Sequence, residues 1–366
     1  MNRLTANHIK LNQPLPFDAF DAQGNLLLRK GYVVDRQTQI EKLIERGLYA
    51  SEDDFNFIQS QRPENTPAAF NPFWLWDDIF SKLVYVLKYA NSEDLFEDKI
   101  TAIAYLLVNL TDTDPDAALA GILLKDGSRY AYAHSLHVAI LTAIISRRLG
   151  WPENLRLEAI QAALTMNVAM IDLQMILLYQ KEPLSEEQRF EVRMHPKKGV
   201  QFLSVKGIGN PRWLDAVRLH HETLPLKTTA TPDGAAMSQL LRVLDVFCAK
   251  VSPRAYRRAL QPPVAAREIF VQEREGCGQY VEALIKEIGL YMPGTFVKLA
   301  NGETALVVKR GGSVNTPRVM SLTRGDGMPF LEAMRRDTAK SEFAVKAAVP
   351  REKIMHALNL SKIWGY

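Results

Sequence analysis

Side chains that can bind a metal ion are concentrated in the middle of this chain, and they constrain its organisation more than any other feature. Only His8 and His356, of seven histidines, lie outside the segment from His134 to His221. Histidine and aspartate are common metal ligands. Five candidate ligands fall in or shortly after this segment: His134, His195, His220, His221 and Asp245.

The sequence around these residues has the apolar spacing of helices. The segment 132–150 reads YAHSLHVAILTAIISRRLG, and segments at 73–89, about 95–109 and 114–124 precede it. Asp114 followed by Pro115 is a typical helix start. The sequence therefore predicts a mainly α protein with an all-α core.

The two ends of the chain differ from this core. Residues 1–60 alternate short apolar runs with turn signals and predict a small N-terminal α/β module, with a helix over 36–46. Near the other end, Asn301-Gly302 between two apolar runs predicts a β-hairpin, with RVMSLT as a third strand and a return to helix from about Pro350. The predicted division is 1–60, then 61–125 as linker and helical extension, 126–290 as the main helical domain, and 291–366 as β-hairpin appendage and terminal helix.

Composition excludes several classes of function. With 45 basic and 41 acidic residues the net charge is only +4, so we expect no nucleic-acid polymer as partner. Two cysteines, outside any Cys-x-x-Cys pair, cannot build a disulfide framework. The N-terminus lacks the apolar region of a signal peptide, and no run of 18 apolar residues follows, so we expect a cytoplasmic protein without a membrane span.

Five motifs follow one another in a familiar order between about Arg129 and Gly289. They are His134-Ser135 with Val138-Ala139, then His195-Pro196, His220-His221-Glu222, Val243 to Phe247, and Ser252 to Arg258. Together they resemble the HD-GYP group of the HD superfamily, bacterial phosphodiesterases that hydrolyse cyclic di-GMP. The resemblance implies an HD-superfamily helical bundle over 126–290.

Three pieces of the family pattern are replaced. Met166 and Asn167 stand where the family has its His-Asp pair, and Met170 stands where it has a lysine. The Gly-Tyr-Pro loop that follows His-His-Glu is replaced by residues 223–229, and the acidic position four residues before His134 is Tyr130. The sequence is thus similar to a degenerate member of the group.

The resemblance implies a reduced metal site. Of the residues that hold the family's first cation, only His134 and Asp245 remain here, so we expect that this cation is not bound. A second would keep His195, His220 and His221, which could still hold one divalent transition metal ion, iron, manganese, nickel or zinc. The alternative is that these histidines are buried core residues that hydrogen-bond one another and Asp245.

The same resemblance suggests an anion site. Arg254 and Arg257 stand where the family places basic residues against the phosphates of the dinucleotide, and arginine binds phosphate oxygens in a bidentate way. Cyclic di-GMP is therefore a candidate ligand. The alternative is a solvated basic helix face, since Arg258 is also basic.

Our leading hypothesis is a catalytically inactive HD-GYP-like regulatory protein of bacterial cyclic di-GMP signalling. It would act by binding cyclic di-GMP, a diguanylate cyclase or another signalling protein. One rival is an active metal-dependent cyclic di-GMP phosphodiesterase with an altered single-metal site, for which Asp172 and Glu222 are the candidate acids. Another is a scaffold without any ligand.

Overall fold

The protein is seen in a computed structural model that describes residues 2–3, 14–21, 24–35, 39, 43, 49–51, 54, 70–125, 129–223, 229–253, 255, 257–272, 274–313, 315–350 and 358–366. These residues belong to two compact units, Met1–Phe70 and Asn71–Tyr366, which are treated one at a time below. The finer division of the chain into four parts stays a prediction.

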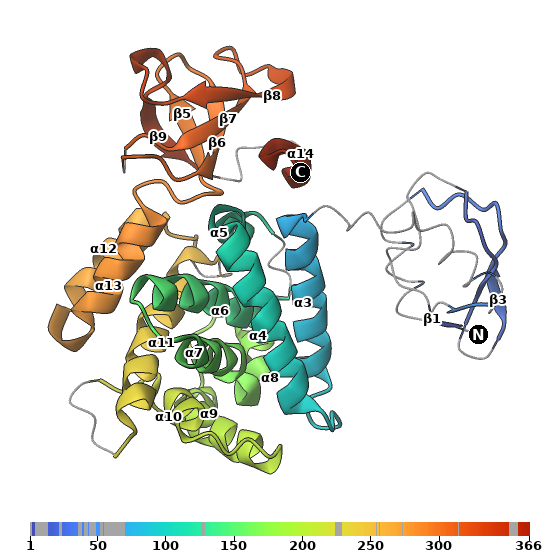
Figure 1. The fold of residues 1–366 in the computed structure, drawn as a ribbon, viewed down its shortest axis with the longest axis vertical. Helices are drawn as coiled ribbons and strands as arrows, with labels where there is room; N and C mark the ends of the chain where they lie inside the picture. Colours follow the sequence, from blue (N-terminus) through green and yellow to red (C-terminus); the bar gives the residue numbers. More distant parts are fainter. Residues whose placement is uncertain are drawn as a thin grey trace. The chain divides into compact units, whose positions relative to one another are not determined.

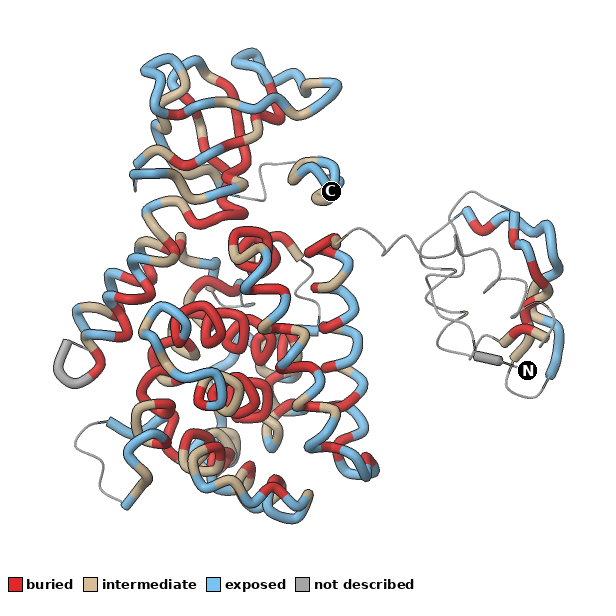
Figure 2. Tube along the Cα trace, in the orientation of Figure 1, coloured by how far each residue is buried: buried red, intermediate tan, exposed pale blue. Residues whose placement is uncertain are grey.

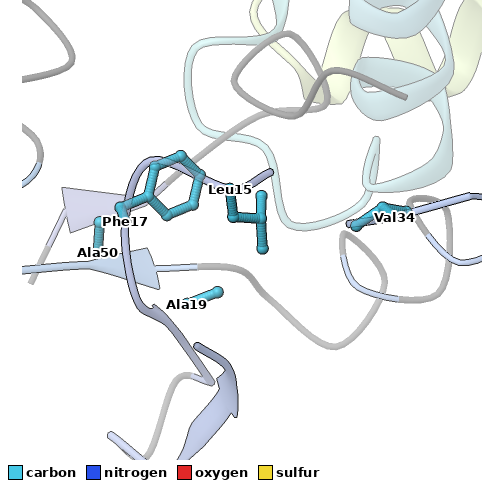
Figure 3. Close-up of a cluster of buried hydrophobic side chains, with 5 residues drawn as sticks. All are labelled: Leu15, Phe17, Ala19, Val34 and Ala50. Atoms are coloured by element: carbon cyan, nitrogen blue, oxygen red, sulfur yellow. The ribbon is translucent and has the colours of Figure 1, made fainter. Parts of the chain in front are cut away.

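The first unit contains a small antiparallel sheet with strand order β1-β4-β2-β3. Its core consists of apolar side chains from the strands and their connections, shown in Figure 3. The predicted turn near Gly24 joins β2 to β3, and Gly24 has the positive φ of 84° that such a turn needs. The predicted helix over 36–46 falls mostly outside the described residues. The strands are β1 (Asn2–Arg3), β2 (Ala19–Phe20), β3 (Leu26–Leu28) and β4 (Tyr49–Ala50), and the core residues are Leu15, Phe17, Ala19, Val34 and Ala50.

The second unit is built mainly of helices, which confirms the predicted α core (Figure 1). Helix α6 lies at its centre: 16 of its 19 residues are buried, because it is apolar all round (Figure 2). The helices are α3 (Pro72–Lys88), α4 (Phe96–Thr113), α5 (Pro115–Leu124), α6 (Tyr130–Arg148), α7 (Glu153–Thr165), α8 (Ile171–Tyr179), α9 (Glu186–Val205), α10 (Pro211–Leu219), α11 (Pro232–Val251), α12 (Pro262–Gln272) and α13 (Arg274–Ile288).

Side chains at the helix ends fix where several of these helices begin. Asp114 accepts a hydrogen bond from the backbone of Ala117, as the sequence predicted for the start of α5. Ser185 and Gln188 form a capping box at the start of α9. Asn210 caps α10, whose first residue is Pro211. Helices α9 and α10, which carry the candidate ligands, therefore start at positions set by local sequence.

One stretch, Glu153–Tyr179, is long and apolar enough by length and composition to cross a membrane. Half of its most apolar window is buried inside the structure, and the 3-10 turn Val168–Met170 interrupts it between α7 and α8. Burial in a protein core accounts for such a composition without a membrane.

Helices α3 and α5 pack closely where Trp76 of α3 meets Gly121 of α5. A Cβ atom at Gly121 would lie 2.2 Å from Nε1 of Trp76, whose side chain is only 1% exposed. We expect Gly121→Ala to lower the free energy of unfolding by about 1–3 kcal/mol, as over-packing does. Chemical denaturation monitored by circular dichroism measures the unfolding free energies of the variant and of the unmodified protein.

Gly278 of α13 is the matched control. It also lies within a helix, but nothing lies within 4 Å of its added Cβ. Gly278→Ala is expected to raise the unfolding free energy by about 0.4–1 kcal/mol, since alanine loses less backbone entropy on folding. Equal effects of the two substitutions would contradict the close packing at Trp76.

A five-stranded antiparallel sheet follows the helices, with strand order β8-β7-β6-β5-β9. The predicted hairpin around Asn301-Gly302 is confirmed as β5 and β6, and the predicted third strand is β7. Strands β8 and β9 were not predicted from the sequence, because they are edge strands with largely exposed side chains and lack a clear apolar alternation. The strands are β5 (Phe296–Leu299), β6 (Thr304–Lys309), β7 (Arg318–Thr323), β8 (Pro329–Asp337) and β9 (Val345–Val349).

The sheet and the terminal helix pack on the helical part of the same unit. Ala120 and Leu124 of α5 share a buried cluster with Phe296 of β5 and Leu306 of β6. The short helix α14 (Leu360–Trp364) places the Trp364 ring 5.0 Å from that of Phe73. The predicted return to helix is therefore seen at 360–364, whereas residues 351–357 are outside the described residues.

Candidate metal centre

Two helices bring the predicted histidine ligands together. His195 lies within α9, His220 follows the last residue of α10, and His221 comes next in the chain. The ring centroids lie 5.1 Å apart for His195 and His220, 5.1 Å for His195 and His221, and 4.2 Å for His220 and His221. One nitrogen from each ring lies within 4.8 Å of the others, the arrangement required to share one ion. We call these three residues the histidine cluster.

Two of the cluster rings have a fixed hydrogen-bonding orientation. Nδ1 of His195 lies 2.6 Å from the carbonyl oxygen of Val192, and Nδ1 of His220 lies 2.7 Å from that of Val217. A carbonyl oxygen only accepts hydrogen bonds, so each Nδ1 must carry the proton that it donates. In a neutral imidazole the other nitrogen, Nε2, then holds a free lone pair. A ligating histidine commonly donates its other nitrogen to a backbone carbonyl in this way.

The two Nε2 atoms face each other at 3.1 Å. Burial, with a smaller effect of the nearby His221, lowers the pKa of His195 to about 4. Burial likewise lowers the pKa of His220 well below its ordinary value. Both rings are therefore neutral near pH 7, and two lone pairs in contact repel each other. A cation bound to both nitrogens would turn this repulsion into attraction, so the donor set fits a transition metal ion.

The cluster is closed on one side and open on the other. His195 is 1% exposed and His220 is fully buried, whereas His221 is exposed. Three protein nitrogens and an open position are typical of zinc sites that bind a further ligand.

His134 and Asp245 lie beside the cluster but satisfy each other. Nε2 of His134 donates to Oδ1 of Asp245 at 2.6 Å, and the hydroxyl of Tyr130 donates to Nδ1 of His134 at 3.1 Å. Burial raises the pKa of Asp245, but the hydrogen bond from His134 and the charges of His134, His221 and His220 outweigh it and hold the pKa well below its ordinary value. Both nitrogens of His134 are therefore occupied by protein groups.

The positions of the replaced motif lie at the end of α7 and in the 3-10 turn after it. Met166 is fully buried and Asn167 is 2% exposed, while Met170 is partly exposed. The Asn167 side-chain nitrogen has no hydrogen-bond partner among the described residues. An amide and a thioether replace the charged ligand and imidazole that the resemblance implies here, so this turn offers no anionic ligand.

The structure describes only one of the two arginines of the predicted anion site. Arg254 lies outside the described residues, as do residues 224–228 of the segment that replaces the Gly-Tyr-Pro loop. Arg257 is partly buried, and its Nη2 donates to the carbonyl oxygen of Ala249 at 2.5 Å, near the end of α11. This contact is a structural role that the sequence did not indicate, because it depends on the path of the chain after α11.

His137 is buried about one helical turn after His134. The centroid of its ring lies 6.1 Å from that of Trp76. Burial, with a smaller effect of His134, lowers its pKa to about 3, below the ordinary value of 6.5. Between these two values the unfolded chain binds a proton that the folded chain does not. The contribution of this group to stability is therefore complete above pH 6.5 and is lost as the pH falls toward 3.

Replacing His137 by leucine removes this proton uptake. We expect the unfolding free energy of His137→Leu to fall less steeply between pH 6 and pH 4 than that of the unmodified protein, by about 1.4 kcal/mol per pH unit. Urea titrations at several pH values measure both slopes, and the other histidines contribute equally to each protein. Parallel slopes would show that His137 is protonated in the folded state.

Known proteins resemble this chain in sequence and in fold. No protein-family model matches the sequence. A cyclic di-GMP phosphodiesterase of Pseudomonas aeruginosa, PA4108, is 29% identical over 212 residues, which are 56% of this chain and 51% of that protein. The chain thus matches about half the length of this relative.

A solved structure shares the fold. Bd1817, described as an HDG"Y"P protein from Bdellovibrio bacteriovorus, superposes with a TM-score of 0.56 over 78% of this chain and 98% of that one, at 14% identity. The predicted mainly α fold is confirmed, and the helical core shares the fold of Bd1817. The resemblance to HD-GYP proteins is confirmed as well.

Proposed function

We propose that this protein is a catalytically inactive relative of cyclic di-GMP phosphodiesterases, which keeps one metal site and acts in cyclic di-GMP signalling by binding. The ion would be held by His195, His220 and His221. The observation that carries this proposal is the pair of neutral Nε2 atoms 3.1 Å apart, each fixed by a backbone carbonyl on its far side. Three imidazoles favour zinc, nickel or iron, with manganese as a harder alternative.

The lack of a second ion follows from the residues around the histidine cluster. Two cations a few ångströms apart need a bridging anion to offset their repulsion. Asn167 has no charge to supply, and Asp245 is engaged by His134. A bound ion can polarise a phosphodiester, but hydrolysis also needs groups that position water and protonate the leaving oxygen.

The alternative, an active enzyme with a single metal ion, lacks these groups among the described residues. The candidate acids Asp172 and Glu222 are both exposed. Glu222 follows the cluster directly, and its backbone N–H and C=O are bonded to Leu219 and Gln239. Neither carboxyl group lies in a buried site where it could be held against a substrate away from water.

Binding would then be the function that remains. The ligand would be cyclic di-GMP or a protein of the same signalling system, such as a diguanylate cyclase. The similarity to the Pseudomonas aeruginosa phosphodiesterase supports the nucleotide, whereas the contact between Arg257 and Ala249 leaves fewer donors for its phosphates.

Three measurements on one purified sample test the proposal: metal content, calorimetric titration with cyclic di-GMP, and hydrolysis of the same nucleotide. We expect about one metal ion per chain and no turnover. Turnover that a chelator abolishes would establish the active alternative instead. No metal and no nucleotide binding would leave the scaffold without a ligand.

A further inference from the structure

A cavity of about 350 Å³ lies away from the histidine cluster. Its lining includes Arg147 and Arg148 at the end of α6, Glu287 of α13 and Arg310 just after β6. His134 lies 13 residues before Arg147 on the same helix, which separates their backbones by about 20 Å. The cavity has the volume of a small-molecule site and is distinct from the proposed metal site.

The lining of this cavity is positively charged. It contains three guanidinium groups and a single carboxylate, Glu287, to which both Arg148 and Arg310 are ion-paired. Two further carboxylates reach these arginines: Asp112, 3.1 Å from Arg147, and Asp116, 2.5 Å from Arg310. Asp112 is also shared, because Arg156 lies 3.0 Å from it. Four arginines therefore share three carboxylates.

The arginines keep donors for another partner. Each guanidinium has five N–H groups. Arg147 uses one nitrogen on Asp112 and Arg148 uses one on Glu287. Arg310 uses Nε on Asp116 and Nη1 on Glu287, so only its Nη2 is left to offer. The side chains of Arg147 and Arg148 are 55% and 40% exposed, and that of Arg310 is 26% exposed. Planar forks with unused donors suit the oxygens of a phosphate group.

The start of α5 also borders the cavity, since Pro115, its first residue, and Thr111 of α4 line it. The N-terminus of a helix carries a partial positive charge. Here the Asp114 carboxylate caps this end by accepting from the backbone of Ala117, and Asp116 lies in the first turn, so two carboxylates offset that charge. The positive potential of the cavity therefore comes from its arginines.

We infer that this cavity binds a small phosphate-bearing anion through Arg147, Arg148 and Arg310. Arg310 directly follows β6 of the C-terminal sheet, while Arg147 and Arg148 belong to the helical core of the same unit. An anion held by all three therefore links the sheet to the core. This site needs neither the metal nor the histidine cluster, so it stands apart from the function proposed above.

Calorimetric titrations with inorganic phosphate and with guanosine monophosphate test the inference, at an ionic strength kept constant with sodium chloride. We expect saturable binding of at least one of these probes below about 10 mM. Arg147→Gln, which changes an exposed side chain, is expected to weaken it by at least ~10-fold, since it removes a charge-assisted contact. Arg189→Gln, an exposed arginine on α9 outside the cavity, is the matched control and is expected to change nothing.

A third variant, His220→Ala, separates this site from the metal site. Binding that survives His220→Ala but is weakened by Arg147→Gln supports the cavity, and the tighter of the two probes shows whether the ligand is phosphate alone or a nucleotide. The inference is overturned if neither probe saturates, if Arg147→Gln binds like the Arg189→Gln control, or if His220→Ala abolishes binding. In each of those cases the arginines form only an ion-pair network between sheet and core.

Discussion

Replacing His220 by alanine is expected to remove the metal ion from a protein that otherwise binds about one ion per chain. His220 is fully buried, and its Nε2 faces that of His195 at 3.1 Å. Without it, only His195 and the exposed His221 remain as ligands in the cluster. Since loss of an outer hydrogen-bond partner alone weakens metal binding about 10–100-fold, loss of a direct ligand should weaken it by more than ~100-fold. Elemental analysis and titration with zinc or nickel measure the change.

His134→Gln is the control for this experiment. His134 is also buried, but both of its ring nitrogens are bonded to Asp245 and Tyr130. A single ion at the histidine cluster predicts that this variant keeps its metal. If His134→Gln loses the ion as completely as His220→Ala does, the ion lies between the two groups of residues and the proposed ligand set is wrong. Thermal melting of both variants shows whether either has merely unfolded.

The second large effect is a gain of activity on restoring the replaced motif. In the triple variant Met166→His, Asn167→Asp and Met170→Lys, a carboxylate again stands where a second ion would need one. We expect metal content to rise from about one to about two ions per chain, and hydrolysis of cyclic di-GMP to rise from undetectable to measurable. Met170 is partly exposed, so lysine fits there, while Met166 is fully buried and its replacement carries most of the folding cost.

Asn167→Asp alone is the matched variant. It restores the charge without the imidazole, so we expect some gain in metal content without turnover. A folded triple variant that still binds one ion and shows no turnover would mean that the pairing of His134 with Asp245, rather than the charge at residue 167, prevents the second ion from binding.

The sequence predicted the helical core and the gathering of the histidines, because both depend on signals that are local or ordered along the chain. Apolar spacing and caps such as Asp114 locate helices without knowledge of the fold. The orientation of the cluster could not be predicted in the same way. It depends on which carbonyls, those of Val192 and Val217, lie behind His195 and His220 once α9 and α10 have packed.

Other features were missed for similar reasons. The arginine-lined cavity joins α6 to α13 and to the residue after β6, which lie more than 100 residues further along the chain, and no local pattern connects them. The edge strand β8 carries largely exposed side chains, so hydrogen bonding to β7 rather than apolar alternation defines it. Expectations for Arg254 and for the 1–60 boundary stay predictions.

The bond between His134 and Asp245 has a consequence for the protein inside a cell. It joins α6 to α11 across 111 residues of sequence through protein groups, so this link does not require an ion at the histidine cluster. Proteins whose folding requires a metal are degraded when that metal is scarce. This chain should instead persist at constant abundance during metal starvation, while the fraction of chains that carry an ion falls.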